Sequence, residues 1–187
     1  MEELISLLKT DTNVANAFGA LASAAAAVLA LFASCISVWI SISSAKSQRQ
    51  HNELSVRPLA EVTASDYEDC LRIKLKNNGT GPMIISAMTV SDGSNAHESI
   101  VEWMPKLPEG RAWNNFTNSL RSRTLSAGSE LVLLELAEFE GERDFSSCRD
   151  IVREALASLS VNVEYTDIYG KIMQPYKRSL SWFARNL

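Results

Sequence analysis

The chain has 187 residues, with 18 Lys and Arg against 22 Asp and Glu and a formal net charge of −4 at pH 7. This length allows about one folded domain of ordinary size together with a membrane anchor. From Ser55 onward the charges nearly balance, with 15 basic and 18 acidic residues, so bulk charge excludes a strongly basic nucleic-acid binder.

An uncharged stretch runs from Thr12 to Ala45 and is rich in Ala, Leu, Ile, Val, Phe and Ser. About 20 apolar residues in a helix are enough to cross a bilayer core. We therefore predict a transmembrane helix over 14–45, preceded by a short N-terminal segment, 1–13. In that segment an amphipathic turn at the membrane interface is predicted from Leu4, Ile5, Leu7 and Leu8. The residues suited to cap the main helix are Asp11, Thr12 and Asn13.

A secretory signal peptide is the competing interpretation of this stretch. Such a peptide has a basic amino end, an apolar part of about 7 to 15 residues and a small-residue cleavage site. The amino end here carries Glu2, Glu3 and Asp11 against a single Lys9, and the apolar part is much longer. The composition therefore favours a retained anchor.

Basic residues flank the predicted span unequally. Lys46, Arg49 and Arg57 follow it, whereas only Lys9 precedes it. Because Lys and Arg close to a span tend to stay on the cytoplasmic side, we predict that the C-terminal domain lies in the cytoplasm. The chain is then a single-pass protein of the inner (cytoplasmic) membrane.

One face of the predicted helix consists of small and polar residues, here called the Ala/Ser stripe. Alternating steps of four and three select Asn16, Ala20, Ser23, Ala27, Ala30, Ser34, Ser37, Ser41 and Ser44. The positions facing away are bulky: Phe18, Leu21, Val28, Leu29, Phe32, Ile36, Trp39 and Ile42. Small side chains let membrane helices approach closely, and this heptad-like spacing favours a left-handed supercoil. Gly19, Ser23 and Ala27 add a second small-residue track. We expect a homo-oligomer, such as a tetramer, packed through the stripe.

The serines in the second half of the stripe leave two interpretations open. In a bundle, Ser34, Ser37, Ser41 and Ser44 would line a narrow aqueous path. Alternatively, the same hydroxyls bond to carbonyls of their own helix and have no further role.

Beyond the span, polar residues 46–55 predict a helical stalk that Pro58 ends. A β domain is predicted over 56–187. Short or alternating apolar runs predict strands at 59–62, 71–76, 83–90, 120–125, 130–136, 160–165 and 171–180. Turns are predicted at the NNGTGP segment 77–82, at Asp92-Gly93 and at 167–170.

Two segments of the β domain have helical spacing, at 98–106 and at 146–158, and 113–120 is predicted as a loop or helical turn. In the second helix Ser146 or Ser147 is the predicted cap, and the residues expected to face inward are Ile151, Val152, Ala155 and Leu156. About seven strands with helical insertions are typical of an immunoglobulin-like β-sandwich. The cysteine pair and tryptophan of immunoglobulin domains are absent from the sequence, so only the architecture is predicted.

The sequence contains no recognisable catalytic constellation. His51 and His97 belong to no HExxH or zinc-binding pattern, and GxSxG, Walker and GxGxxG motifs are absent. The NNGTGP segment leads into a strand and not a helix, so it lacks the geometry that cradles phosphate. Cys35, Cys70 and Cys148 form no CxxC pair, as expected in a reducing compartment. We expect no enzymatic activity, no metal and no cofactor.

Two segments combine cations with aromatic side chains, as in sites that hold nucleotides or short oligonucleotides. The first contains Arg111, Trp113, Asn114, Asn115, Phe116, Arg121 and Arg123. The second contains Tyr176, Lys177, Arg178 and Trp182. The alternative interpretation is structural: the arginines pair with the acidic run Glu138, Glu140 and Glu142, and the aromatics pack in the core.

The layout of the chain, with the Ala/Ser stripe followed by a β domain beyond Leu54, resembles small bacterial membrane effectors of anti-phage defence. The segments LSVRPLAEV and LKNNGTGP also look like parts of bacterial membrane-anchored β-sandwich proteins. The resemblance implies a cytosolic sensor domain that controls membrane permeability, and hence a homo-oligomeric, nucleotide-responsive pore or membrane-disrupting effector. The alternative is a membrane-anchored adaptor or immunity-type protein that binds a protein partner through its β domain.

Overall fold

The structure is a computed structural model that describes residues 6, 12–139, 141–142 and 144–186. It divides into two compact units, Met1–Asn52 and Glu53–Leu187. The predicted interfacial turn at Leu4, Ile5, Leu7 and Leu8 and the predicted cap Asp11 lie outside the described residues.

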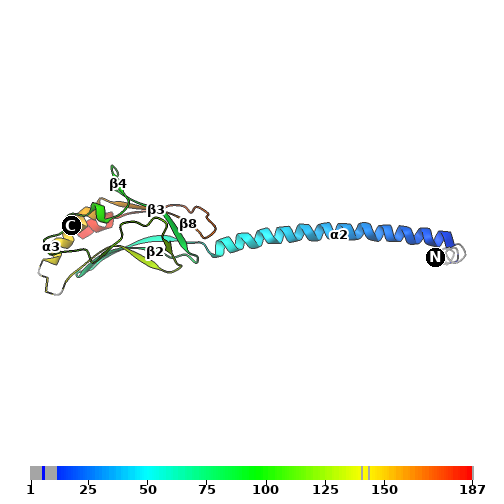
Figure 1. Ribbon diagram of the computed structural model, residues 1–187, viewed down its shortest axis with the longest axis horizontal. Helices are drawn as coiled ribbons and strands as arrows, with labels where there is room; N and C mark the ends of the chain where they lie inside the picture. The colour runs from blue at the N-terminus through cyan, green and yellow to red at the C-terminus, as the bar shows by residue number, and fades with distance from the viewer. Residues whose placement is uncertain (1–5, 7–11, 140, 143, 187) are drawn as a thin grey trace. The chain divides into compact units, whose positions relative to one another are not determined.

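The first unit is dominated by α2, which runs without a break from Thr12 to Ser55, so that its last three residues belong to the second unit (Figure 1). The helix therefore contains both the predicted span and the predicted stalk. None of its residues is buried, and by length and composition it is able to cross a membrane. Pro58 follows three residues after its end, where the missing N–H group costs no helical hydrogen bond.

The second unit contains two antiparallel sheets. The first has the order β1-β2-β7-β5 and consists of Ala60–Asp66, Cys70–Asn77, Glu130–Ala137 and Asn115–Phe116. The second has the order β4-β3-β8-β9 and consists of Ala96–His97, Met83–Ser91, Ser160–Thr166 and Tyr176–Ser179. A short strand, β6 (Thr124–Leu125), also pairs with β3. Figure 1 shows β2 in one layer and β3 with β8 in the other.

The core lies between these layers and follows from the period of two in the strands. In β2, Leu71, Ile73 and Leu75 are fully buried, whereas the intervening cations are only partly covered. One continuous apolar cluster joins the inward residues of both sheets, including Met83, Ile85, Val90, Leu134, Leu136, Val161 and Val163. The alternation predicted for 71–76 is thus confirmed.

The turn at 77–82 fixes where the chain enters the β domain. Asn77 is fully buried; its Oδ1 accepts hydrogen bonds from the N–H groups of Leu59 and Gly79, and its Nδ2 donates to the carbonyl of Gly81. A Cβ atom at Gly81 would lie 1.9 Å from the backbone oxygen of Val56. Only glycine allows the two backbones to approach this closely.

The helix α3 extends over Phe145–Ala157 and so begins before the predicted boundary. The prediction that Ser146 or Ser147 caps it is wrong, because Asp144 occupies the cap position and makes no side-chain cap hydrogen bond. Ile151 is also not an inward residue, since 50% of it is exposed; the buried face instead includes Val152, Arg153 and Leu156. The inward face is therefore rotated toward Arg153. Figure 1 shows α3 near the C-terminal segment, where it contacts the 3-10 helix η2 (Ser181–Asn186).

Four other predicted elements are shorter or different. The predicted strand 171–180 is reduced to β9 (Tyr176–Ser179). The predicted strand 120–125 is reduced to β6, because a turn closes from Leu120 to Arg123 and Ser122 has a φ of 63°. The predicted helix 98–106 is a single 3-10 turn, η1 (Val101–Trp103), preceded by hydrogen bonds from Ser99 to the Glu102 carboxylate. The segment predicted as loop or helical turn, 113–120, contains β5, which pairs with β7.

Candidate functional site

The β domain has two ends with different character. At the proximal end, β1 begins after α2, and Ala60 pairs with Asn77 beside the 77–82 turn. At the distal end, Asp66 pairs with Leu71 around the 67–69 turn. Because β7 is antiparallel to β2, its last residue, Ala137, also lies at the distal end opposite Cys70.

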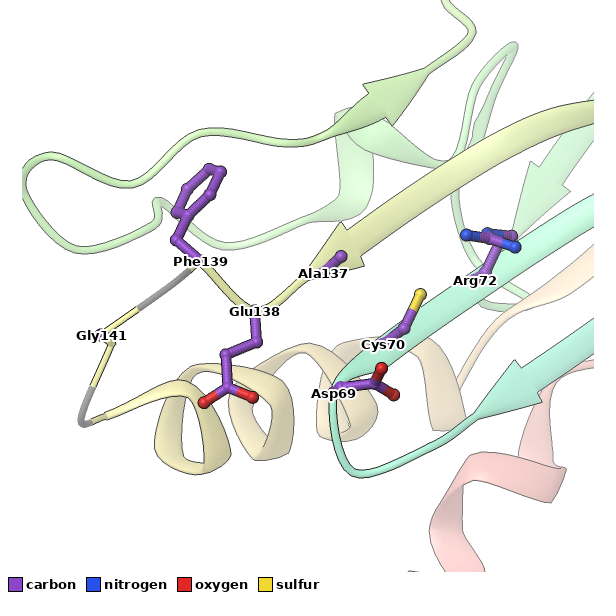
Figure 2. A pocket seen from close by; sticks show the side chains of 7 residues that line it. All are labelled: Asp69, Cys70, Arg72, Ala137, Glu138, Phe139 and Gly141. Atoms are coloured by element: carbon purple, nitrogen blue, oxygen red, sulfur yellow. The ribbon is translucent and has the colours of Figure 1, made fainter.

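A cavity of about 460 Å³ opens at this distal end (Figure 2). The residues that line it are Asp69, Cys70, Arg72, Ala137, Glu138, Phe139 and Gly141. Figure 2 shows Cys70 and Arg72 on β2 beside the end of β7, while Glu138 and Phe139 belong to the segment that leads toward α3. The cavity thus forms between two stretches of chain more than sixty residues apart.

The electrostatics of this distal cavity do not suit a phosphate. Among the described lining residues the cation is Arg72, and it is engaged, since its Nη2 donates to Oε1 of Glu135 at 2.5 Å. Asp69 and Glu138 add two carboxylates to the lining. Burial raises the pKa of the Cys70 thiol, and the neighbouring Arg72 guanidinium opposes this only in part. The cavity therefore offers negative charge and a protonated thiol, which fit a cationic or neutral group.

Two arginines of α3 fix the turn that borders the cavity. Arg149 donates from Nη1 to the carbonyls of Tyr67 and Glu68, at 2.6 and 2.8 Å. One turn further along, Arg153 forms a two-pronged pair with Asp66, with Nη2 at 2.8 Å from Oδ1 and Nε at 3.0 Å from Oδ2. Both side chains of this pair are buried. The turn is thereby attached to the helix by charge-assisted hydrogen bonds.

Arg111 fixes the opposite border. Its Nη2 donates to the carbonyl of Ala137 at 2.5 Å, its Nη1 lies 2.8 Å from the Glu142 carboxylate, and its guanidinium stacks 4.4 Å from the centre of the Phe139 ring. The Arg111 side chain is only 5% exposed. This contact with Glu142 is the one that the structural interpretation of the cation-rich segment predicts; Glu140 lies outside the described residues.

Three large apolar side chains are nevertheless exposed at the distal end. They are Tyr67, Phe139 and Ile151, at 65%, 47% and 50% exposure. Tyr67 is held by Arg149 through its carbonyl, and Phe139 carries the stacked Arg111. The distal end therefore presents apolar side chains on an ordered backbone next to an acidic cavity. Sequence inspection missed this site because its parts become adjacent only through the pairing of β2 with β7.

The other predicted ligand-binding residues are distributed over both sheets. Trp113 and Tyr176 pack against the core. Asn114 accepts a hydrogen bond from the Ala137 N–H at 2.7 Å. Arg121 is exposed and lies 3.5 Å from the Glu98 carboxylate, and Arg123 is exposed as well. The structure therefore does not bring Arg111 and Trp113 together with the β9 residues into one site.

A second hollow, of about 330 Å³, lies on the outer face of the β3-β8-β9 sheet, here called the polar face. It is lined by Thr89, Ser91, Ser160, Asn162, Lys177, Arg178 and Ser179. The strand register places Thr89, Asn162 and Lys177 in one row across the three strands. Arg178 donates to the Val62 carbonyl on β1, which leaves Lys177 as the exposed cation of the lining. None of these lining residues is acidic.

In α2 the hydroxyls of the Ala/Ser stripe bond within the helix. Ser34, Ser37 and Ser41 each donate to the carbonyl four residues earlier at 2.8 Å, and Ser23 does the same. This is the geometry of the second interpretation of the serines. Each hydroxyl oxygen keeps lone pairs that accept hydrogen bonds.

The described residues contain no group of three or more His, Cys, Asp or Glu side chains placed to hold a metal ion. The family model for a domain of unknown function, DUF8453, matches residues 17–184. Because this match covers most of the chain, the protein belongs to that family. No curated protein and no solved structure matches the chain.

Proposed function

We propose that this protein is a membrane-anchored adaptor: α2 spans the inner membrane once, the β domain lies in the cytoplasm, and its distal end binds a protein partner. One observation carries the proposal. Phe139 lines the acidic cavity, Tyr67 lies two residues before Asp69, which also lines it, and both aromatic side chains are exposed on a backbone that buried and stacked arginines hold in place. Exposed aromatic side chains are enriched among the residues that carry binding energy at interaction surfaces.

The chemistry of the distal cavity suggests what the partner presents. Binding hot spots are enriched in aromatic residues that are already ordered before binding, because little side-chain entropy is then lost. Phe139, whose ring carries the stacked Arg111, fits that role, and Tyr67 offers an exposed ring on a fixed backbone. The carboxylates of Asp69 and Glu138 favour a Lys or Arg of the partner in the cavity. We infer that the partner supplies an apolar segment that contains a basic residue.

We also assign the β domain to the immunoglobulin-like sandwiches. In such domains one sheet has the order A-B-E-D and the other contains C-F-G, with C′ added beside C in some types. The orders β1-β2-β7-β5 and β4-β3-β8-β9 correspond to A-B-E-D and C′-C-F-G, while the short strand β6, which also pairs with β3, has no counterpart in them. In this assignment α3 is an insertion between E and F. Sandwiches of this class commonly bind partners through the loops at their ends, which agrees with a site at the distal end.

A site-specific crosslinking experiment in cells tests the adaptor proposal. A photoreactive phenylalanine analogue replaces Phe139 or Tyr67 in the full chain, and the control carries it at Phe116, which is 44% exposed on β5. We expect a discrete adduct from positions 67 and 139, loss of that adduct when Glu138→Lys is added, and no such adduct from position 116. Equal adducts from all three positions, or none from 67 and 139, would contradict the proposal.

The second candidate is a homo-oligomeric, nucleotide-responsive pore or membrane-disrupting effector of anti-phage defence. The observation in its favour is the polar face, whose lining has an exposed lysine, several hydroxyls and no carboxylate, as an anionic ligand requires. The Ala/Ser stripe supplies the helix contacts for a tetramer. In this scheme a nucleotide that binds one helix arrangement better than another shifts the population.

Exchanging the membrane span separates the two candidates. An unrelated single span in place of 14–45 leaves an adaptor functional, whereas it abolishes a pore built from the Ala/Ser stripe. For the pore, purified full chain in vesicles must give leakage that responds to an added nucleotide and that Ser34→Leu with Ser37→Leu removes. Leakage that changes neither when the nucleotide is added nor when these substitutions are made would exclude the gated pore.

A further inference from the structure

We propose that residues 167–172 of the loop between β8 and β9, here called the apolar loop, dock on the bilayer surface beside the anchor. The inference rests on the membrane insertion of α2 proposed above. Three large apolar side chains of this loop are exposed: Ile168 and Tyr169 at 50% and 55%, and Ile172 at 82%. Ile172 is the most exposed large apolar residue in the described part of the chain.

The backbone of the apolar loop is ordered from within. Asp167 is 1% exposed, and its Oδ1 accepts hydrogen bonds from the N–H groups of Tyr169 and Lys171, both at 2.9 Å. A further bond joins the Asp167 N–H to the Lys171 carbonyl, and Gly170 takes a φ of 78° that favours glycine. The carboxylate thus points inward while the apolar side chains point outward. This is the reverse of an ordinary surface loop, and it presents an ordered apolar tip.

The apolar loop lies at the proximal end of the domain. The Lys171 ammonium is 3.7 Å from the Glu53 carboxylate, and the Tyr165 hydroxyl accepts a hydrogen bond from the Ala60 N–H at 3.4 Å. Leu54 and Leu59, in the same stretch of chain, are also more than half exposed. Most of the exposed large apolar residues outside the predicted span therefore belong to the proximal end. Solvent alone does not explain such a concentration.

The length of α2 brings this end close to lipid. The helix is continuous from the end of the predicted span at Ala45 to Glu53, eight residues later, which is about 12 Å of helix. The polar headgroup layer of a bilayer occupies about 5 to 8 Å on each side of the hydrocarbon core. Glu53, and with it the apolar loop, is therefore held within a few ångströms of the headgroups. The covalent connection supplies a high local concentration, so even a weak contact becomes populated.

The composition of the apolar loop identifies the bilayer as its occupant. Tyr is enriched at membrane interfaces, and Lys extends its ammonium toward phosphates while its stem lies on apolar surface. Ile168 and Ile172 provide the part that enters the acyl boundary. If the apolar loop only paired with a second copy of the chain, its position next to the membrane span would have no function. The loop is thus a second membrane contact that limits how the domain swings about its anchor.

Spin-label accessibility tests the docking on the full chain in vesicles of phosphatidylcholine and phosphatidylglycerol. In a background with Cys35→Ser, Cys70→Ser and Cys148→Ala, one label is placed by Ile172→Cys. The matched control is Ser94→Cys, in an exposed turn at the distal end, and the membrane reference is Leu29→Cys in the span. We expect the ratio of oxygen to water-soluble nickel accessibility at position 172 to exceed that at 94 severalfold. Adding Ile168→Ser should lower the accessibility ratio at position 172.

The outcomes are distinguishable. An aqueous label at position 29 would overturn the proposed membrane insertion itself. A lipid-exposed label at 29 with an aqueous label at 172 would overturn only the docking. A label at 172 that is shielded from both reagents, with spin–spin broadening that disappears on dilution with unlabelled chain, would show a second copy as the occupant and would likewise overturn the docking. Circular dichroism of the labelled variants verifies that each retains the β domain.

Discussion

Replacing Arg153 by alanine should destabilise the β domain by about 3 kcal/mol, at the lower end of the cost of removing one partner from a buried ion pair. The Arg153 side chain is 8% exposed and that of Asp66 is 0% exposed. The substitution removes the hydrogen bonds at 2.8, 3.0 and 3.2 Å between Arg153 and the Asp66 carboxylate and leaves that charge buried. We take the lower end of the range because the adjoining 67–69 turn can open and admit water.

The assay is thermal unfolding of the full chain in a mild detergent, followed by near-ultraviolet circular dichroism, which reports the packed aromatics of the β domain. For a domain of this size about 3 kcal/mol lowers Tm by about 10 °C. The matched control is Arg121→Ala, because Arg121 also pairs with a distant carboxylate, Glu98, but both side chains are more than 60% exposed. An exposed pair contributes about 0.2 to 1 kcal/mol. Adding Asp66→Asn to Arg153→Ala should recover part of the loss; equal effects of Arg153→Ala and Arg121→Ala would refute the reasoning.

Three further predictions concern single residues. Asn77→Ala should lower the free energy of unfolding by about 3 kcal/mol, because it leaves several buried backbone groups at the proximal end without their partner; the same melting assay measures it. Gly81→Ala should prevent folding of the β domain, since its Cβ would lie 1.9 Å from a backbone oxygen. Gly141→Ala is the comparison: a Cβ atom there would meet no atom within 4 Å, so this variant tests for the separate effect of a positive φ. Burial raises the pKa of the Cys148 thiol, so its thiolate fraction at neutral pH is smaller than that of free cysteine. Iodoacetamide should therefore alkylate Cys148 more slowly than free cysteine, and the rate should increase as the pH rises, as mass spectrometry of the modified peptide would detect.

The sequence predicted those parts of the fold that local patterns determine. The alternation of Leu71, Ile73 and Leu75 with cations predicts β2 because a strand exposes every second side chain to one face. The NNGTGP segment predicts the 77–82 turn because glycine and proline determine the local backbone. The long uncharged stretch predicts α2 because no soluble element needs so many apolar residues in sequence.

The features that sequence inspection missed depend on contacts between distant segments. The pair Arg153–Asp66 joins residues 87 positions apart, and neither residue has a neighbouring motif that indicates burial. For the same reason the sequence predicts Ile151 on the inward face of α3, whereas in the structure Arg153 lies on the buried face and Ile151 is half exposed. The distal cavity likewise forms only because strand pairing places Cys70 of β2 opposite Ala137 of β7. The prediction of a strand over all of 120–125 is wrong because Ser122 adopts a positive φ, and no residue type in this segment indicates such a backbone conformation.

The two ends of the β domain are suited to different contacts. The seven residues of β1 separate them by about 23 Å, at about 3.3 Å for each residue of a strand. In the proposed arrangement, with the apolar loop at the lipid headgroups, a partner bound at Tyr67 and Phe139 would be clear of those headgroups. An adaptor that is held by both its helix and its apolar loop would present the distal end in a limited range of directions, so that the docking contact increases the local concentration of a correctly oriented binding site.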